Sequence, residues 1–192
     1  LVTKSEELNN LIKKIKKNGF CAIDTETNSL SIEDANLVGV SIAIDENSAY
    51  YIPINHKNIK NNKKAKDQVN QTELIKSLKF ICNDKSILKI GHNIKYDLRV
   101  LDKYDVKFQS IADTMLLSYA IDNGVTKHNM DDLAYLHLNH TNIKYKDLVG
   151  SGKKEITFDY VDIDKALEYA AEDALVTLKL YNLLNKRVKN EN

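Results

Sequence analysis

The chain has 192 residues, of which 43% are hydrophobic and 29% are charged. This balance is typical of a folded globular domain, and it excludes a disordered chain, a collagen-like fibre and a small disulfide-stabilised scaffold. Lys and Arg total 28 while Asp and Glu total 27, so the net charge of +1 indicates neither a general polyanion binder nor a membrane-surface protein.

The first third of the chain predicts one helix and a meander of strands. Apolar residues recur at helical intervals from Leu8 to Ile15 and stop before Gly19. Further along, apolar and polar residues alternate as they do in strands. The expected elements are a helix over 5–17 opened by a capping box at 3–6, a short apolar strand over 20–24, and strands over 38–44 and 49–54.

A polar stretch over 56–70 separates these strands from a remainder rich in helices. It carries five lysines between 57 and 66 with no acid among them, which predicts a solvated surface loop; a loop that follows a nucleic-acid backbone is the alternative. The later expected elements are a strand over 87–91, helices over 72–81, 96–104, 113–120 and 130–138, a flexible basic loop over 150–154, and a long helix from Asp162 or Asp164 to about 188. Strands first and helices later predict an α/β or α+β domain.

Cysteine usage and the N-terminus bear on the setting of the protein. Cys21 and Cys82 lie in apolar runs without CxxC spacing, so we expect two buried, reduced thiols. No apolar signal segment opens the sequence, and we expect a cytoplasmic protein. Because the chain begins with Leu1 and not Met, we expect residues 1–192 to be a single domain taken from a longer protein.

Two acids stand at the end of an otherwise apolar strand. Asp24 and Glu26 have i, i+2 spacing, which places both carboxylates on one side of extended backbone. Two adjacent anions repel each other, and a hard divalent cation removes the conflict by taking oxygen ligands from both. The pair therefore suggests a metal site.

Two further acids occur in apolar surroundings far along the chain. Asp97 lies near the start of a helix after a buried strand, and Asp173 lies among alanines in the long helix, four residues after Tyr169. Taken singly, Asp97 could be a helix cap and Asp173 a solvated charge. Convergent carboxylates without a His or Cys cluster favour Mg²⁺ or Mn²⁺ over zinc.

Three segments of the chain resemble the three motifs of the DEDDy 3′-5′ exonucleases. They are Phe20–Leu30 (FCAIDTETNSL), Gly91–Asp97 (GHNIKYD) and Tyr169–Asp173 (YAAED). The chain is similar, over nearly its whole length, to the proofreading exonuclease domains of bacterial DNA polymerase I, including the segments 35–39, 113–116 and 128–131. Three motifs in order, with these segments between them, are far more specific than any one of them.

The resemblance implies a ribonuclease H-like fold, a mixed sheet flanked by helices, with the active site at the strand ends. It implies two-metal-ion hydrolysis with Mg²⁺ or Mn²⁺, in which Tyr169 orients the attacking water through its hydroxyl. The residues carried over are Asp24, Glu26, Asp97 and Asp173 as metal ligands, Tyr169 as a further catalytic residue, and Leu30, His92, Asn93, Tyr96 and Tyr145 as substrate-binding residues. One departure is His92, since relatives often have glutamine there.

The same resemblance implies a biological role. A monomeric exonuclease domain, covalently linked to a polymerase domain and independent of membranes, would remove nucleotides from the 3′ end of single-stranded or frayed DNA. An RNA-trimming exonuclease of the ribonuclease D type has the same acids and stays open as an alternative. A non-catalytic domain that only braces a polymerase is a third interpretation, and the presence of all four acids and the tyrosine argues against it.

Overall fold

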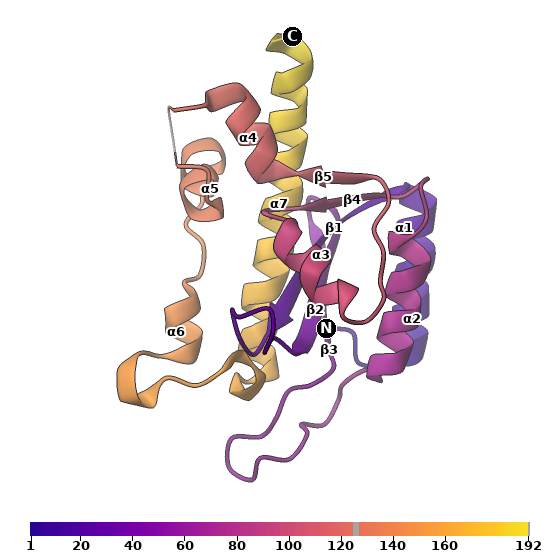
Figure 1. Ribbon diagram of the computed structural model, residues 1–192, viewed down its shortest axis with the longest axis vertical. Coiled ribbons are helices and arrows are strands. Elements are labelled where there is room, and N and C mark those ends of the chain that lie inside the picture. Colours follow the sequence, from indigo (N-terminus) through magenta and orange to yellow (C-terminus); the bar gives the residue numbers. More distant parts are fainter. Residues whose placement is uncertain (125–126, 192) are drawn as a thin grey trace.

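The computed structural model describes residues 1–124 and 127–191, which form an α/β fold around one mixed sheet (Figure 1). The strands are β1 (Phe20–Thr27), β2 (Leu37–Asp45), β3 (Ser48–Pro53), β4 (Leu88–Gly91) and β5 (Ile111–Asp113). Their spatial order is β3-β2-β1-β4-β5. β1, β2 and β3 pair antiparallel, whereas β4 and β5 continue the sheet in parallel from β1. The predicted α/β class is therefore confirmed.

Helices cover both faces of this sheet. They are α1 (Ser5–Asn18), α2 (Gln71–Cys82), α3 (Lys95–Asp102), α4 (Thr114–Asp122), α5 (Met130–Leu138), α6 (Tyr145–Val149) and α7 (Ile163–Glu191). α1, α2 and α3 pack on one face, and α7 crosses the other face over β1 to β4. α4 and α5 then pack against α7 (Figure 1). Within the described residues, none of the helices is both long and apolar enough to cross a membrane.

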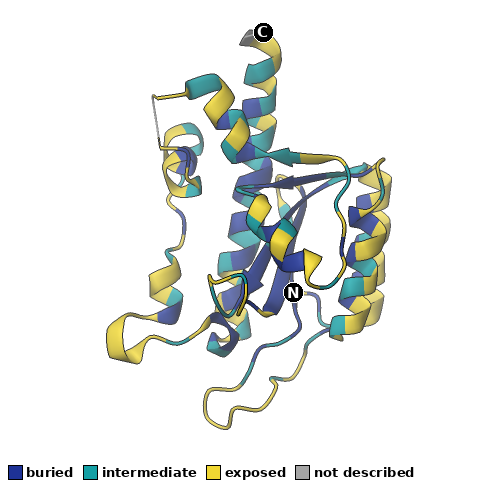
Figure 2. Ribbon diagram, in the orientation of Figure 1, coloured by how far each residue is buried: buried dark blue, intermediate teal, exposed yellow. Residues whose placement is uncertain are grey.

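The alternation of side chains along β1 decides which residues meet α7. Cys21 and Ile23 belong to the core beneath α1 and α2, whereas Ala22 belongs to a second core that includes Ala174 and Leu178 of α7. Small side chains at this contact let the helix lie close to the sheet, and the central turns of α7 are buried (Figure 2). Asp24 and Glu26 continue the face of Ala22.

The structure corrects several predicted boundaries. β1 continues to Thr27, three residues past the predicted apolar run, because its polar residues remain paired with β2. The capping carboxylate of α1 belongs to Glu7, which accepts hydrogen bonds from the backbone N–H groups of Thr3 and Lys4 at 2.9 and 3.1 Å. Three-residue β5 and five-residue α6 were not predicted, since such short elements show no periodicity. Both cysteines are free and buried, as expected.

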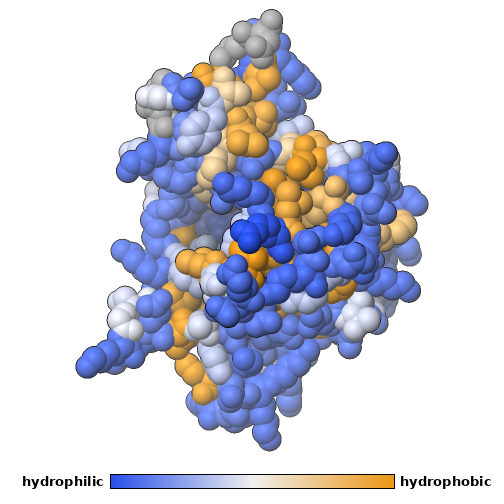
Figure 3. All heavy atoms as spheres, in the orientation of Figure 1, coloured by the Kyte–Doolittle hydropathy of each residue, from blue (hydrophilic) through white to orange (hydrophobic). Residues whose placement is uncertain are grey.

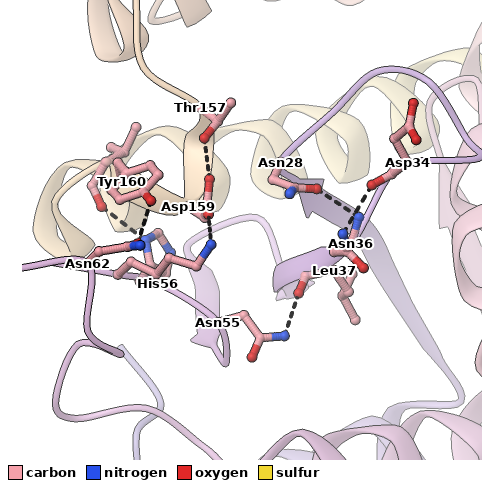
Figure 4. A network of polar contacts seen from close by, with 12 residues as sticks. Asn28, Asp34, Asn36, Leu37, Asn55, His56, Asn62, Thr157, Asp159 and Tyr160 are labelled. Carbon is pink, nitrogen blue, oxygen red and sulfur yellow. Dashed lines mark hydrogen bonds and ion pairs between the residues drawn. The ribbon is translucent and has the colours of Figure 1, made fainter. Parts of the chain in front are cut away.

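The lysine-rich segment over 56–70 is an exposed surface loop, as predicted (Figure 3). Contacts with the residues that precede α7 hold it against the protein (Figure 4). Lys57 forms an ion pair with the buried carboxylate of Asp159 at 2.8 Å. The Tyr160 hydroxyl donates a hydrogen bond to the side chain of Asn62. The first lysine of the loop is thus engaged by the protein itself.

A buried tyrosine and histidine hold β3 against the segment that precedes α7. The Tyr51 hydroxyl lies 2.6 Å from His56 Nε2, and His56 Nδ1 lies 3.0 Å from the carbonyl oxygen of Val161. Since that carbonyl can only accept, Nδ1 carries the proton and the Tyr51 hydroxyl donates to Nε2. Burial lowers the pKa of His56, which favours this neutral form.

We predict that Gly39→Ala destabilises the fold. A Cβ atom at residue 39 would lie 2.2 Å from the Tyr51 hydroxyl, and both residues are buried between sheet and helix. Overpacking of this kind costs about 1–3 kcal/mol of the free energy of unfolding, which urea titration measures. The control is Ser41→Ala, which removes a buried hydroxyl that has no hydrogen-bond partner and should leave stability almost unchanged. Equal stability of the two variants would contradict the close packing of Tyr51 on Gly39.

Candidate active site

Three carboxylates converge between β1 and α7. Asp24 pairs with Ser41 and Glu26 with Gly39 in the antiparallel ladder, which places both acids on the face that α7 covers. Asp173 enters from α7, and one oxygen of each acid lies within 4.8 Å of the others. Acids separated by almost 150 residues in the sequence thus meet, as a common cation site requires.

Asp97 contacts β1 on the side of β4, opposite to the side that pairs with β2. β4 pairs with β1 only over residues 20–22, so the backbone of β1 beyond that point has no strand on this side. Asp97 on α3 fills the place, because its Oδ1 accepts hydrogen bonds from the Thr25 N–H at 2.9 Å and the Thr25 hydroxyl at 2.6 Å. Both bonds go to one oxygen, so Oδ2 is left clear of them.

Tyr169 stands one helical turn before Asp173 on α7. The i, i+4 spacing places the two side chains on one face of α7, so the phenol and the carboxylate are neighbours. Burial raises the pKa of the Tyr169 hydroxyl well above its ordinary value, and the negative charge of Asp173 raises it further. The phenol therefore keeps its proton and is available as a hydrogen-bond donor.

The four acids oppose one another electrostatically. Burial, and then the charge of Asp173, raises the pKa of Asp24 to about 8, and burial raises that of Asp173 to about 7. The pKa values of Glu26 and Asp97 are also raised by burial and by neighbouring carboxylates. None of the ion pairs of the described residues involves these acids. The cluster therefore lacks a compensating positive charge.

The residues present fit a hard divalent cation. Glu26 Oε1 is buried and has no hydrogen-bond partner, which is costly for a carboxylate oxygen unless a ligand takes it up. The converging donors are all carboxylate oxygens, the ligand type that Mg²⁺ and Mn²⁺ prefer. The arrangement can hold a cation and, through it, an anionic substrate.

Three of the residues expected to contact substrate lie beyond the end of β1 or beside Tyr169. The Tyr96 hydroxyl lies 2.7 Å from the Thr27 hydroxyl and donates to the carbonyl of Ser29 at 2.9 Å, so Tyr96 braces the end of β1. Leu30, just beyond, is 84% exposed. Tyr145 is 39% exposed, and its ring centroid lies 6.1 Å from that of Tyr169. An apolar side chain is thus exposed four residues beyond Glu26, and an accessible aromatic ring lies beside Tyr169.

The two other residues expected to contact substrate, Asn93 and His92, are bound to Asp113 and Thr114 at the junction of β5 and α4. Asn93 adopts a left-handed backbone conformation, with φ at 55°, and its N–H donates to Asp113 at 3.0 Å. His92 Nδ1 lies 2.8 Å from the Thr114 hydroxyl, while its Nε2 is buried without a partner. Burial lowers the pKa of His92 to about 4, so this ring is neutral. Its described contact is with Thr114 and not with the acids.

Several residues that shape the site were not singled out from the sequence. Thr25 binds Asp97, and Phe158, fully buried, lies beneath Tyr145 with its ring nearly parallel, at 6.2 Å between centroids. Glu172 binds the segment that precedes Tyr145. Thr25 and Glu172 stand next to acids of the first and third motifs, and this position could have marked them as site residues. No motif or spacing near Phe158 indicates its role.

Comparisons with known proteins agree on the family. A family model described as a 3′-5′ exonuclease matches residues 1–189. DNA polymerase I of Rhizobium leguminosarum is 42% identical over 194 residues, which cover 94% of this chain and 19% of that protein. The chain thus spans about a fifth of the length of the curated relatives it matches.

Solved structures show the same fold. NrnC of Brucella melitensis with bound Mg²⁺ superposes with a TM-score of 0.66 at 26% identity, covering 90% of this chain and 75% of that chain. RNase D of Trypanosoma brucei gives a TM-score of 0.75 at 17% identity, covering 95% and 63%. The second likeness shows the fold alone, and the predicted ribonuclease H-like class is confirmed. By sequence and fold together, the chain belongs to the 3′-5′ exonuclease family and is a hydrolase of phosphodiester bonds.

Proposed function

We propose that this chain removes nucleotides from the 3′ end of single-stranded or frayed DNA, using two Mg²⁺ or Mn²⁺ ions. The observation that carries the proposal is the meeting of Asp24, Glu26 and Asp173 within 4.8 Å, beside Asp97 and the protonated hydroxyl of Tyr169. Family membership supports the direction of cleavage.

The family resemblance suggests how the acids would share two ions. Asp24, Glu26 and Asp173 would hold one ion, and Asp24 would also serve a second, to which Asp97 would contribute largely through water. Divalent ions bound here would stabilise charge on the scissile phosphate and lower the pKa of the attacking water. The bonds from Thr25 fix the orientation of Asp97 before any ligand binds.

The remaining groups of the site orient the substrate. Tyr169 keeps its hydroxyl proton, so it would align an attacking water through a hydrogen bond without removing a proton from it. Tyr145 and Tyr96 would stack on terminal bases, a contact that tolerates any sequence, and Leu30 would wedge between them. Asn93 and His92 would contact the single-stranded DNA next to α3.

The setting of this activity is also a proposal. Because bacterial DNA polymerase I proteins match the chain over about a fifth of their length, we place it as a single proofreading domain, monomeric and covalently linked to a polymerase domain in the bacterial cytoplasm.

We predict that Asp173→Ala lowers the rate of 3′-end digestion by more than about 100-fold, because loss of even an indirect support of a metal ligand costs about 10–100-fold. The assay is Mg²⁺-dependent shortening of a 5′-labelled single strand, repeated in chelator. Binding of the same strand should remain detectable in the variant.

The matched control is Glu168→Gln, an exposed acid on the same helix. Undiminished digestion by a purified, folded Asp173→Ala variant would contradict the assignment of the site. A matched RNA strand serves as a second substrate, and degradation of RNA in preference to DNA would favour the ribonuclease D-type alternative.

We also predict a pH dependence of stability without divalent ions. The raised pKa values of Asp24 and Asp173 mean that the folded state holds protons which the unfolded chain releases near pH 4. The free energy of unfolding should therefore fall as the pH rises from about 4 to about 8, and added Mg²⁺ should restore stability at the upper end. Urea unfolding in chelator and in Mg²⁺ measures both effects.

Asp173→Asn should flatten this slope, and Asp34→Asn, at an exposed acid away from the cluster, should not. If the Asp173→Asn protein kept the full slope and the full response to Mg²⁺, the carboxylate cluster would not be their source.

A further inference from the structure

Glu172 links α7 to the chain that leads into α6. Its Oε1 lies 2.8 Å from His140 Nε2, and its Oε2 accepts a hydrogen bond from the backbone N–H of Ile143 at 2.7 Å. The connection between α5 and α6, residues 139–144, is thereby held at two points by one carboxylate. Asn142, between these points, is buried.

The first residue of α6 is Tyr145, so this connection is one of the attachments that place it, beside the packing of its ring on Phe158. A helix of five residues is not stable by itself, and the Lys144 side chain provides no cap for it. Lys144 does pair with Asp131 at 2.7 Å, but both side chains are more than 40% exposed, and such pairs contribute little. The half-buried Glu172 makes the stronger attachment at this end of α6.

The same turn of α7 carries the groups of the active site. Glu172 directly precedes Asp173 and follows Tyr169 by three residues, so all three side chains project from one helical turn. Tyr145 lies 6.1 Å from Tyr169 between ring centroids. A carboxylate on this turn therefore ties the chain that leads to Tyr145 to the part of α7 that carries Asp173 and Tyr169.

We propose that Glu172 is a positioning residue for substrate: it fixes the α5–α6 connection so that Tyr145 is ready to stack on the terminal base. This inference rests on the proposed function for its kinetic consequence, but the attachment itself can be measured without DNA. It predicts a loss of substrate grip, with the chemistry of the acids left intact.

The first experiment is hydrogen exchange on the protein alone. In Glu172→Ala, the Ile143 amide loses its acceptor and should exchange at least about tenfold faster, together with the amides that follow it into α6. Glu168→Gln is the matched control on the same helix and should leave these amides unchanged. Unaltered exchange in Glu172→Ala would overturn the attachment, whether or not the protein degrades DNA.

The second experiment separates binding from chemistry. Glu172→Ala should raise KM for a single-stranded DNA oligonucleotide about fivefold or more, the effect of losing one aromatic contact with a base, while kcat changes less than about twofold. Glu172→Gln, which keeps one acceptor oxygen, should show a smaller rise. Adding Tyr145→Ala to Glu172→Ala should give no greater rise than Tyr145→Ala alone.

His140→Ala distinguishes attachment from charge. It removes one partner of Glu172 but keeps the negative charge beside Asp173, so a rise in KM without a change in Mg²⁺ dependence supports the proposal. A fall in kcat and altered Mg²⁺ dependence in Glu172→Ala, absent from His140→Ala, would mean that Glu172 acts only through its charge on Asp173.

Fully additive effects of Glu172→Ala and Tyr145→Ala would likewise overturn the proposal. Absence of digestion by the unmodified protein would refute the proposed function alone, since hydrogen exchange still tests the attachment.

Discussion

Repulsion among buried carboxylates is the constraint on which this structure depends. Desolvation raises the pKa of each of the four acids, and neighbouring carboxylates add to it. A fold can hold such a cluster only if its framework is stable without it, because the acids themselves oppose folding near neutral pH. The framework here is the central strand β1, paired with β4 at its start and with β2 from Ala22 onward, and the buried middle of α7. The stored repulsion is what a divalent cation would relieve.

Much of this arrangement could be predicted from the sequence, because its signals are local. The i, i+2 spacing placed Asp24 and Glu26 on one face, and the i, i+4 spacing did the same for Tyr169 and Asp173. An acid among alanines is anomalous in a buried helix, so Asp173 was recognisable before the fold was known. The meeting of Asp24, Glu26 and Asp173 is now observed, whereas the catalytic roles of these residues stay predictions.

Contacts between distant, unremarkable segments could not be predicted in this way. His56 binds Val161 across 105 positions, and Gly39 is needed because the Tyr51 ring occupies the space of its missing side chain. The sequence carries no period or spacing that pairs these residues, since their contacts are created by the crossing of the strands and α7. For the same reason Glu172 was seen only as part of a motif, although it ties residues 140 and 143 to the helix.

The site combines parts of very different rigidity. Asp24 and Glu26 lie on the central strand β1 and Asp173 lies in the buried middle of the long helix α7, where ligand oxygens can be held to the small tolerances that cation geometry requires. Leu30 and Tyr145 lie on short, exposed segments, where single-stranded substrates of variable shape can be accommodated. Rigid metal ligands and adaptable substrate contacts are compatible only if the exposed segments are attached to the rigid elements at a few points. Tyr96 on α3 attaches the end of β1 through Thr27 and Ser29, and Glu172 on α7 attaches the chain that leads into α6. Each segment expected to contact the substrate is thus joined by a side chain to a helix that carries one of the acids.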